Sequence, residues 1–182
     1  NSNHSVSFTA FNSSTKRGMQ GVASDEANQL AGTNYYNPNW GYQNGEKRNA
    51  RVRFQQEPTF IFNHYWNINE KTTLTTNIGY SFGTYSTTSL NWYDAQDPRP
   101  DYYRKLPSYW ATSGEDVMNE IADAFRNDVN TRQINWNSLY QTNYRSLDTS
   151  KYIIENRITD SRQFVLSSVL NWDFKSNIKL VS

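Results

Sequence analysis

The chain has 182 residues and no cysteine, so it forms neither disulfides nor thiolate metal sites. Its charges nearly cancel, with 18 basic and 17 acidic side chains and a formal net charge of +1. Charge therefore gives no reason to expect a nucleic-acid partner. No apolar run approaches the roughly 18 residues of a membrane helix. The first residues lack the basic start and apolar middle of a signal peptide.

Hydrophobic residues are also scarce, whereas aromatic residues are not. Only 36% of the residues are hydrophobic, and the mean hydropathy of -0.89 is low for a chain that must fill a compact core. Yet 15% are aromatic, and disordered chains are poor in aromatic residues. An amphipathic sheet fits both observations, because half of every strand in such a sheet is polar.

Alternation of apolar and polar residues with a period of two is the dominant pattern. It predicts strands at about 4–12, 50–66, 73–93 and 152–174, and a fifth that begins at 178. Even-numbered residues form the apolar face. The exceptions are Ile61 and Tyr65 on the polar face and His64, Asp160 and Arg162 on the apolar face.

Pro58 lies inside the second of these segments. Proline has no backbone N–H to donate to a strand ladder, so we expect a bulge or an end of regular pairing there.

The connections between these strands alternate in length. Short turns are expected near 67–71 and 175–177, and long loops at about 13–49 and 94–151. Short turns at one end of a sheet and long loops at the other are typical of an outer-membrane barrel. Soluble β-sandwiches usually have strands of about 5–6 residues and loops of more even length.

The lengths of the predicted strands also favour a barrel. A tilted membrane strand needs only about 9–11 residues to cross the hydrocarbon, and the segments 50–66, 73–93 and 152–174 are each longer than that. We therefore predict an all-β chain that is part of a large antiparallel transmembrane β-barrel. It would contribute four to five strands and long extracellular loops, one with a short helix. A soluble sheet with a core of aromatic residues is the alternative.

The same alternation assigns residues to the membrane surface. Aromatic side chains near the short turns suit the interface, where an apolar ring and a polar tip are both solvated. We expect Trp66 and Trp172 to be such interface anchors. The predicted lipid-facing residues are Leu74, Ile78, Phe82, Phe164, Leu166 and Leu170.

The second long loop contains a helical pattern. Thr112-Ser113-Gly114-Glu115-Asp116 resembles a helix start, and apolar residues follow at helical spacing: Val117, Ile121, Ala124 and Phe125. We expect a capped amphipathic helix of about three turns. Such a helix is marginal alone in water, so the loop is expected to be packed.

No pattern of catalytic residues is apparent. His4 and His64 lie in different predicted strands, and the chain has no phosphate-binding glycine loop, metal-spaced histidine pair or nucleophile elbow. Glu115, Asp116 and Glu120 are more simply read as a solvated helix face near a helix N-terminus. We expect neither enzymatic activity nor a cofactor.

Asp94, Asp97 and Asp101 are spaced so that one loop could fold them around a calcium ion. The spacing is not that of an EF-hand, and aspartate beside proline is ordinary in turns. Ion pairs with the nearby Arg99, Arg104 and Lys105 are the alternative.

Aromatic residues of the two long loops are the candidates for ligand binding. Flat aromatic faces beside Asn and Arg groups suit sugars, peptides or chelates, although these rings could equally pack the loops against each other. The candidates are Tyr35, Tyr36, Trp40, Tyr42, Tyr102, Tyr103, Tyr109, Trp110 and Trp136.

Residues 35–110 resemble the barrel region of Bacteroidota-type TonB-dependent outer-membrane receptors, most specifically at 47–110. The resemblance lies in the turn WNIN (66–69), a Thr-rich strand ending in YSFG (80–83) and the loop PRPDYYRKLPSY (98–109). The closing segment SSVLNWDFKSNIKL (167–180) resembles another barrel hairpin.

The resemblance implies a nutrient transporter with a barrel of about 22 strands, plugged by an N-terminal domain and energised by TonB. Neither plug nor TonB-contacting segment is found in these residues, and about four strands cannot close a barrel. We therefore expect residues 1–182 to be a fragment of a single barrel domain. The implied partners are outer-membrane lipid, the remainder of the barrel and plug, the TonB complex and a surface lipoprotein.

Two other functions remain open at this stage. One is a barrel without transport, serving as an adhesin or as a subunit of an envelope assembly. The other is a soluble β-sandwich module that binds carbohydrate.

Overall fold

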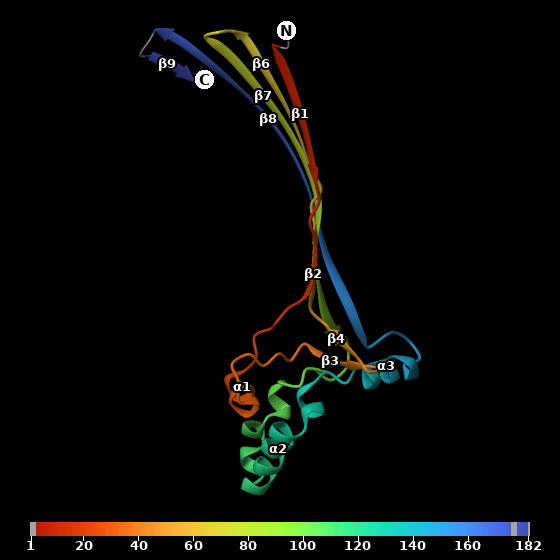
Figure 1. Ribbon diagram of the computed structural model, residues 1–182. Coiled ribbons are helices and arrows are strands. Elements are labelled where there is room, and N and C mark those ends of the chain that lie inside the picture. The colour runs from red at the N-terminus through yellow and green to blue at the C-terminus, as the bar shows by residue number, and fades with distance from the viewer. Residues whose placement is uncertain (1–2, 176–177, 182) are drawn as a thin grey trace. The chain divides into compact units, whose positions relative to one another are not determined.

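The computed structural model describes residues 3–175 and 178–181, with side chains over 3–173 (Figure 1). It is mostly antiparallel β-sheet with few helices. The strands are β1 (His4–Phe11), β2 (Ser14–Gly18), β3 (Trp40–Gln43), β4 (Glu46–Asn49), β5 (Val52–Gln56), β6 (Thr59–Asn69), β7 (Thr72–Trp92), β8 (Tyr152–Lys175) and β9 (Ile178–Val181). The α-helices are α1 (Asp25–Ala31), α2 (Glu115–Asn127) and α3 (Trp136–Arg145). Three short 3-10 helices are η1 (Tyr103–Lys105), η2 (Pro107–Ser113) and η3 (Val129–Arg132).

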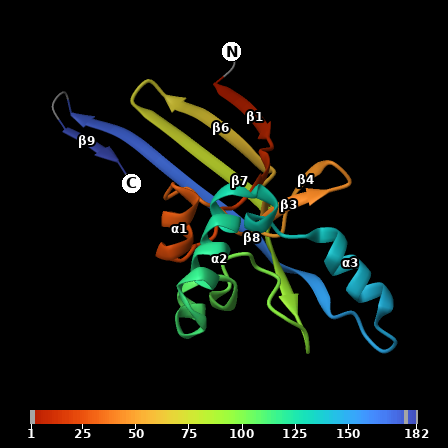
Figure 2. The ribbon, with the colours of Figure 1, turned by 90° about the horizontal axis from the view of Figure 1, so that it is seen from below.

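The larger sheet has the order β1-β6-β7-β5-β2, and β8 pairs with both β7 and β9. Figures 1 and 2 both show β1, β6, β7 and β8 side by side. A separate antiparallel hairpin joins β3 to β4. All five predicted strand segments are therefore present, and their boundaries agree closely with the observed ones.

The chain divides into two compact units. Unit 1 comprises the described parts of Asn1–Thr15, Phe54–Ser86 and Ile158–Ser182. Unit 2 comprises Lys16–Arg53 and Thr87–Arg157.

The pairing register of unit 1 places even-numbered residues on one face. Phe8 lies opposite Phe62 across β1 and β6, and Phe62 lies opposite Ile78 across β6 and β7. Directly opposed residues of antiparallel strands share a face. On the polar face, the Asn77 amide donates to the Ser167 hydroxyl at 3.1 Å. The alternation thus runs in phase over all four strands.

The prediction at Pro58 is confirmed. β5 ends at Gln56 and β6 begins at Thr59, so the proline falls between two strands. The chain here passes close to β7, where the Phe82 amide donates to the Pro58 carbonyl at 3.2 Å. A Cβ atom on Gly83 would lie 2.7 Å from the Gln56 carbonyl oxygen, which accounts for glycine in the YSFG sequence.

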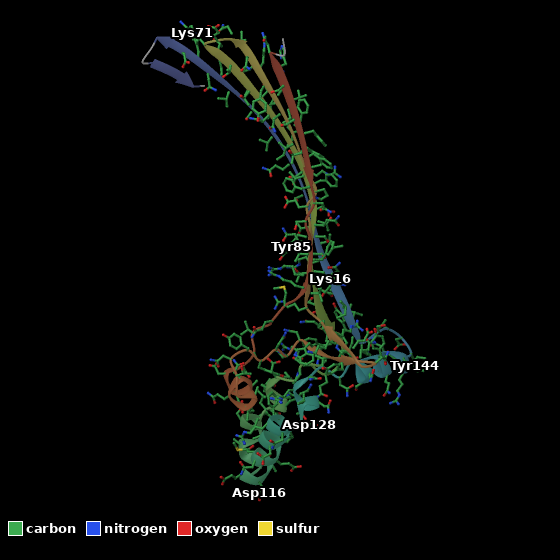
Figure 3. All side chains as sticks on the ribbon, viewed as in Figure 1. Lys16, Lys71, Tyr85, Asp116, Asp128 and Tyr144 are labelled. Atoms are coloured by element: carbon green, nitrogen blue, oxygen red, sulfur yellow. The ribbon has the colours of Figure 1, made fainter. Side chains whose placement is uncertain are left out.

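The short turn between β6 and β7 consists of Glu70 and Lys71, labelled in Figure 3 at Lys71. The Lys71 amide donates to the Asn69 side chain at 2.9 Å, an Asx turn. After a register shift between Asn67 and Asn69, the last pair of the ladder is Asn69 with Thr72. Strand pairing therefore continues past residue 67, and the turn is shorter than the predicted 67–71. The other predicted turn, 175–177, lies mostly outside the described residues.

Unit 2 contains two small hydrophobic cores. The first consists of Ala27, Tyr36, Leu106 and Phe125. The second consists of Ala50, Ile134, Trp136 and Leu139, with Leu90 and Tyr152 packed against it. The long loop 94–151 is therefore packed, as predicted.

The predicted helix is confirmed as α2, which buries Ala122 and Phe125 and carries Asp116 in its first turn (Figure 3). The expected cap is wrong. Gly114 holds the N-cap position with φ 112°, and no side chain donates or accepts a capping bond there. The positive φ favours glycine, so the backbone bend sets the helix start in place of Thr112 or Ser113.

Several elements of unit 2 were not expected from the sequence. The β3–β4 hairpin turns at Asn44 and Gly45, both with positive φ, which is a strong hairpin signal that the sequence does contain. Helix α1 is capped by the Ser24 hydroxyl, and Asn135 caps α3 through a bond from the Ser138 amide at 3.0 Å.

Candidate functional site

Four of the nine candidate aromatic residues form one continuous group in unit 2. Successive edge-to-face contacts join Tyr102 to Tyr103 at 4.7 Å, Tyr103 to Tyr109 at 5.4 Å and Tyr109 to Trp110 at 5.4 Å between ring centroids. The helices η1 and η2 bring these rings together. We call this group the aromatic strip. Three of its members, Tyr103, Tyr109 and Trp110, are exposed large hydrophobic residues.

Arg104 holds the aromatic strip in place. Its guanidinium lies 5.6 Å from the Tyr103 ring and 5.9 Å from the Tyr109 ring. Its Nε donates to the Tyr103 hydroxyl at 3.0 Å, and its carbonyl accepts the Trp110 indole N–H at 3.0 Å. The bond from Arg104 lowers the pKa of the Tyr103 phenol. The strip therefore presents π faces and a cation at one surface.

Trp40 and Tyr42 form a second, smaller aromatic pair on β3. Their rings meet edge to face at 5.6 Å, and the Lys47 ammonium lies 5.3 Å from the Trp40 ring. Tyr35 is 84% exposed.

The last two aromatic candidates lie inside unit 2. Tyr36 is 8% exposed and its hydroxyl donates to the Arg132 carbonyl at 2.9 Å; burial raises the pKa of this phenol. Trp136 is 2% exposed and its indole N–H donates to the Arg48 carbonyl at 3.2 Å. Both rings belong to the hydrophobic cores, which is the packing alternative stated above.

Two of the three aspartates proposed for calcium, Asp94 and Asp97, form ion pairs. Arg99 contacts the Asp97 carboxylate through Nε and Nη2, at 3.0 and 2.6 Å. Lys151 contacts Asp94 at 3.0 Å. No group of three His, Cys, Asp or Glu side chains among the described residues could hold a metal ion. The predicted ion-pair alternative is therefore confirmed for Asp97 with Arg99, whereas the partner of Asp94 is Lys151, which the prediction did not name.

Burial shifts the pKa values of two charged residues in the same loop. It raises the pKa of Asp101, whose Oδ1 is buried and has no hydrogen-bond partner. It lowers the pKa of Lys105, whose ammonium donates to the Arg99 carbonyl at 2.9 Å.

Unit 2 also contains a cavity of about 650 Å³ that the sequence did not reveal. We call it the arginine cavity, because Arg51, Arg99 and Arg157 line it. The other lining residues are Asn39, Ala50, Thr87, Thr88, Ser89, Leu90, Asn91, Trp92, Ile134, Glu155 and Asn156. They come from segments far apart in the chain, so no local motif could have indicated them.

The even-numbered face of unit 1 is apolar and exposed, and we call it the apolar face. Val6, Phe8, Phe164 and Leu166 are 65%, 66%, 65% and 62% exposed. Of the other predicted lipid-facing residues, Phe82 is exposed and Leu74, Ile78 and Leu170 are half-buried. Phe60 stacks between Phe8 and Phe82, at 6.3 and 6.2 Å.

The predicted interface anchors lie near the turn end of unit 1. Trp66 and Trp172 are both exposed. Trp66 stacks on His4 at 5.2 Å, and His4 Nδ1 lies 3.0 Å from His64 Nε2. These two histidines are thus adjacent in space, which their separation in sequence did not indicate.

Two of the polar exceptions on the apolar face, His64 and Asp160, have partners. The Thr84 hydroxyl donates to the Asp160 carboxylate at 2.7 Å. Elsewhere, Glu115, Asp116 and Glu120 are exposed on α2.

None of the helices in the described part of the chain is long and apolar enough to span a membrane. Comparison of the chain with family models, curated proteins and solved structures gives no match.

Proposed function

We propose that this chain is the wall segment of a TonB-dependent outer-membrane nutrient transporter, with two long extracellular loops. Its resemblance over 47–110 supports the transporter assignment. The observation that carries the membrane assignment is the apolar face of unit 1.

The energetics of that face favour lipid over water. Burying one Val, Leu or Phe side chain is worth about 1.5–3 kcal/mol. Soluble monomers rarely expose contiguous apolar patches of more than a few hundred Å². A face that exposes Val6 and Phe8 on β1 and Phe164 and Leu166 on β8 is therefore unfavourable in water, and contact with acyl chains removes that cost.

The opposite face suits a water-filled barrel interior. Side chains on it bond to each other across strands, with Asn63 donating to Ser7 at 3.0 Å and Asn77 to Ser167 at 3.1 Å. Barrel strands alternate between lipid-facing apolar residues and polar residues inside.

Strand length separates this proposal from a soluble β-sandwich. β7 has 21 residues and β8 has 24. Strands of soluble proteins usually have about 3–10 residues. A long strand that crosses the membrane and continues beyond it accounts for both lengths.

The loops would capture the ligand outside the cell, and TonB would then drive rearrangement of the plug from the periplasm. The aromatic strip is the surface best suited to first contact, since its rings and Arg104 lie together and are exposed.

The test uses the complete polypeptide that carries this chain. We expect it in the outer-membrane fraction, soluble only with detergent, and able to bind the purified periplasmic domain of TonB. Outer-membrane location without TonB binding would favour an adhesin or assembly subunit. A monodisperse protein without detergent would favour the β-sandwich and contradict the proposal.

A further inference from the structure

The arginine cavity is large enough for a small organic ligand. Ligand sites in proteins commonly have volumes of about 300–1,000 Å³, and this cavity, which is partly open to solvent, has a volume of about 650 Å³. All its lining residues belong to unit 2. An oligosaccharide of two or three sugars is of the right size.

The charge of the lining is positive and only partly balanced. Asp97 holds Arg99 in a bidentate pair. Arg51 and Arg157 make no ion pair with any described residue, and both are exposed. The acidic residue of the lining, Glu155, accepts a hydrogen bond from the Tyr93 hydroxyl at 2.6 Å. Arg157 lies close enough to Glu155 for the two charges to interact. Because neither Arg51 nor Arg157 is fixed in a salt bridge with a described residue, both guanidinium groups can turn to an anion.

The neutral part of the lining is mainly amide and hydroxyl. Asn156 offers an amide that both donates and accepts, and Thr87 and Ser89 offer hydroxyls. Asn39 and Asn91 also line the cavity, although their amides already bond to Asn37 and Glu155. Such groups match a ligand with many hydroxyls. Trp92 adds an aromatic ring, and the guanidinium of Arg99 lies 5.3 Å from its centroid.

Arginine sets the nature of the anion. Its planar fork of N–H donors fits carboxylate and other oxyanions through paired hydrogen bonds. Ala50, Leu90 and Ile134 add an apolar part to the lining, so the ligand must present apolar as well as polar surface, as the C–H faces of a sugar ring do.

We propose that the arginine cavity binds a short oligosaccharide that bears carboxylate or sulfate groups, with Arg51 and Arg157 pairing with those groups. The statement that this oligosaccharide is the transported cargo rests on the proposed transport function. The binding site itself is inferred from the volume of the cavity and the charge of its lining.

The test is calorimetric titration of the complete polypeptide in detergent. The probes are trigalacturonate, a sulfated galactan trisaccharide and neutral maltotriose. We expect one or both anionic sugars to bind at least about tenfold more tightly than maltotriose, the equivalent of one charged hydrogen bond. The two anionic probes distinguish carboxylate from sulfate.

Variants then locate the site. Arg51→Gln and Arg157→Gln should each weaken binding of the preferred anionic sugar about tenfold. The control Arg145→Gln, at an exposed position on α3 outside the cavity, should leave binding unchanged. If a Gln variant does not fold, the charge-retaining Arg51→Lys and Arg157→Lys replace it, with a smaller loss expected.

The two proposals fail separately. Equal binding of the three sugars, no binding of any, or binding that survives both Gln substitutions would overturn the cavity proposal even if TonB still binds. Anionic binding that depends on Arg51 and Arg157, without TonB binding, would support the site and remove its role in transport.

Discussion

Arg48 connects the β3–β4 hairpin to α3. Its guanidinium lies 4.2 Å from the Trp136 ring and donates to the Gln43 amide oxygen at 2.6 Å and the Tyr140 hydroxyl at 2.8 Å. Its carbonyl accepts the Trp136 indole N–H. The bond from Arg48 lowers the pKa of the Tyr140 phenol. The Arg48 side chain thus joins the β3–β4 hairpin to the core that contains Trp136.

Arg48→Ala should therefore lower the stability of unit 2 by about 1–3 kcal/mol, because a cation–π contact and charged hydrogen bonds are lost. Denaturant unfolding of the complete polypeptide, followed by Trp fluorescence, measures the change. Arg145→Ala, on an exposed side chain of the same helix α3, is the control. Equal midpoints for the two variants would contradict this role of Arg48.

Asp101 gives a pH prediction. Burial raises its pKa, so ionisation costs more in the folded chain than in the unfolded chain. The cost is absent below the unfolded pKa of about 4 and appears as pH rises through the higher folded pKa. Asp101→Asn should therefore raise the unfolding midpoint at neutral pH and have no such effect at about pH 3.

The matched control for Asp101 is Asp148→Asn, at an exposed position in unit 2. A stability gain from Asp101→Asn that is the same at both pH values would show that ionisation of this carboxyl is not the cause.

At the scale of elements, the passage of β5 into β6 beside β7 depends on one glycine. A Cβ on Gly83 would lie 2.7 Å from the Gln56 carbonyl oxygen and 3.2 Å from the Glu57 side chain. Backbone cannot give way as cheaply as a flexible side chain, so the break at Pro58 and the glycine act together to keep the strands paired.

Gly83→Ala should accordingly destabilise unit 1 by about 1–3 kcal/mol through overpacking. Gly79→Ala is the control on the same strand, because its Cβ would meet Val165 at 3.6 Å, an ordinary contact. Unfolding midpoints in detergent compare the two variants. A Gly79 variant that loses as much stability as the Gly83 variant would rule out this contact as the cause.

Strands were predictable because their signal is local. The alternation over 73–93 and 152–174 became β7 and β8, and Pro58 ended a strand as proline should. The Asn44-Gly45 turn and the Ser24 cap of α1 also carry local signals, although neither element was predicted. The start of α2 differed because glycine geometry, not a side-chain cap, defines it.

The candidate site was less predictable, because its parts meet only after folding. The sequence identified Tyr102, Tyr103, Tyr109 and Trp110, which are close along the chain. It did not distinguish them from the buried Tyr36 and Trp136, since burial depends on distant residues such as Phe125 and Arg48. The arginine cavity was not predicted for the same reason, because Arg51 and Arg157 are separated in the sequence by the whole of β6 and β7.

At the scale of the whole molecule, the chain is mostly antiparallel sheet, and the sheet of unit 1 has one exposed apolar face and one polar face. A chain with a mean hydropathy of -0.89 is compatible with a membrane location only if its few apolar side chains face lipid. The membrane assignment therefore depends most on the direction in which the even-numbered side chains of β8 point.

Spin labels on β8 test this directly, because the chain has no cysteine of its own. Single substitutions Phe164→Cys and Leu166→Cys report the even face, and Gln163→Cys and Ser167→Cys report the odd face. In lipid vesicles containing the complete polypeptide, we predict that labels at 164 and 166 collide mainly with oxygen, and labels at 163 and 167 mainly with an aqueous nickel complex. Equal access to the nickel complex at all four positions, or the reverse alternation, would contradict the account.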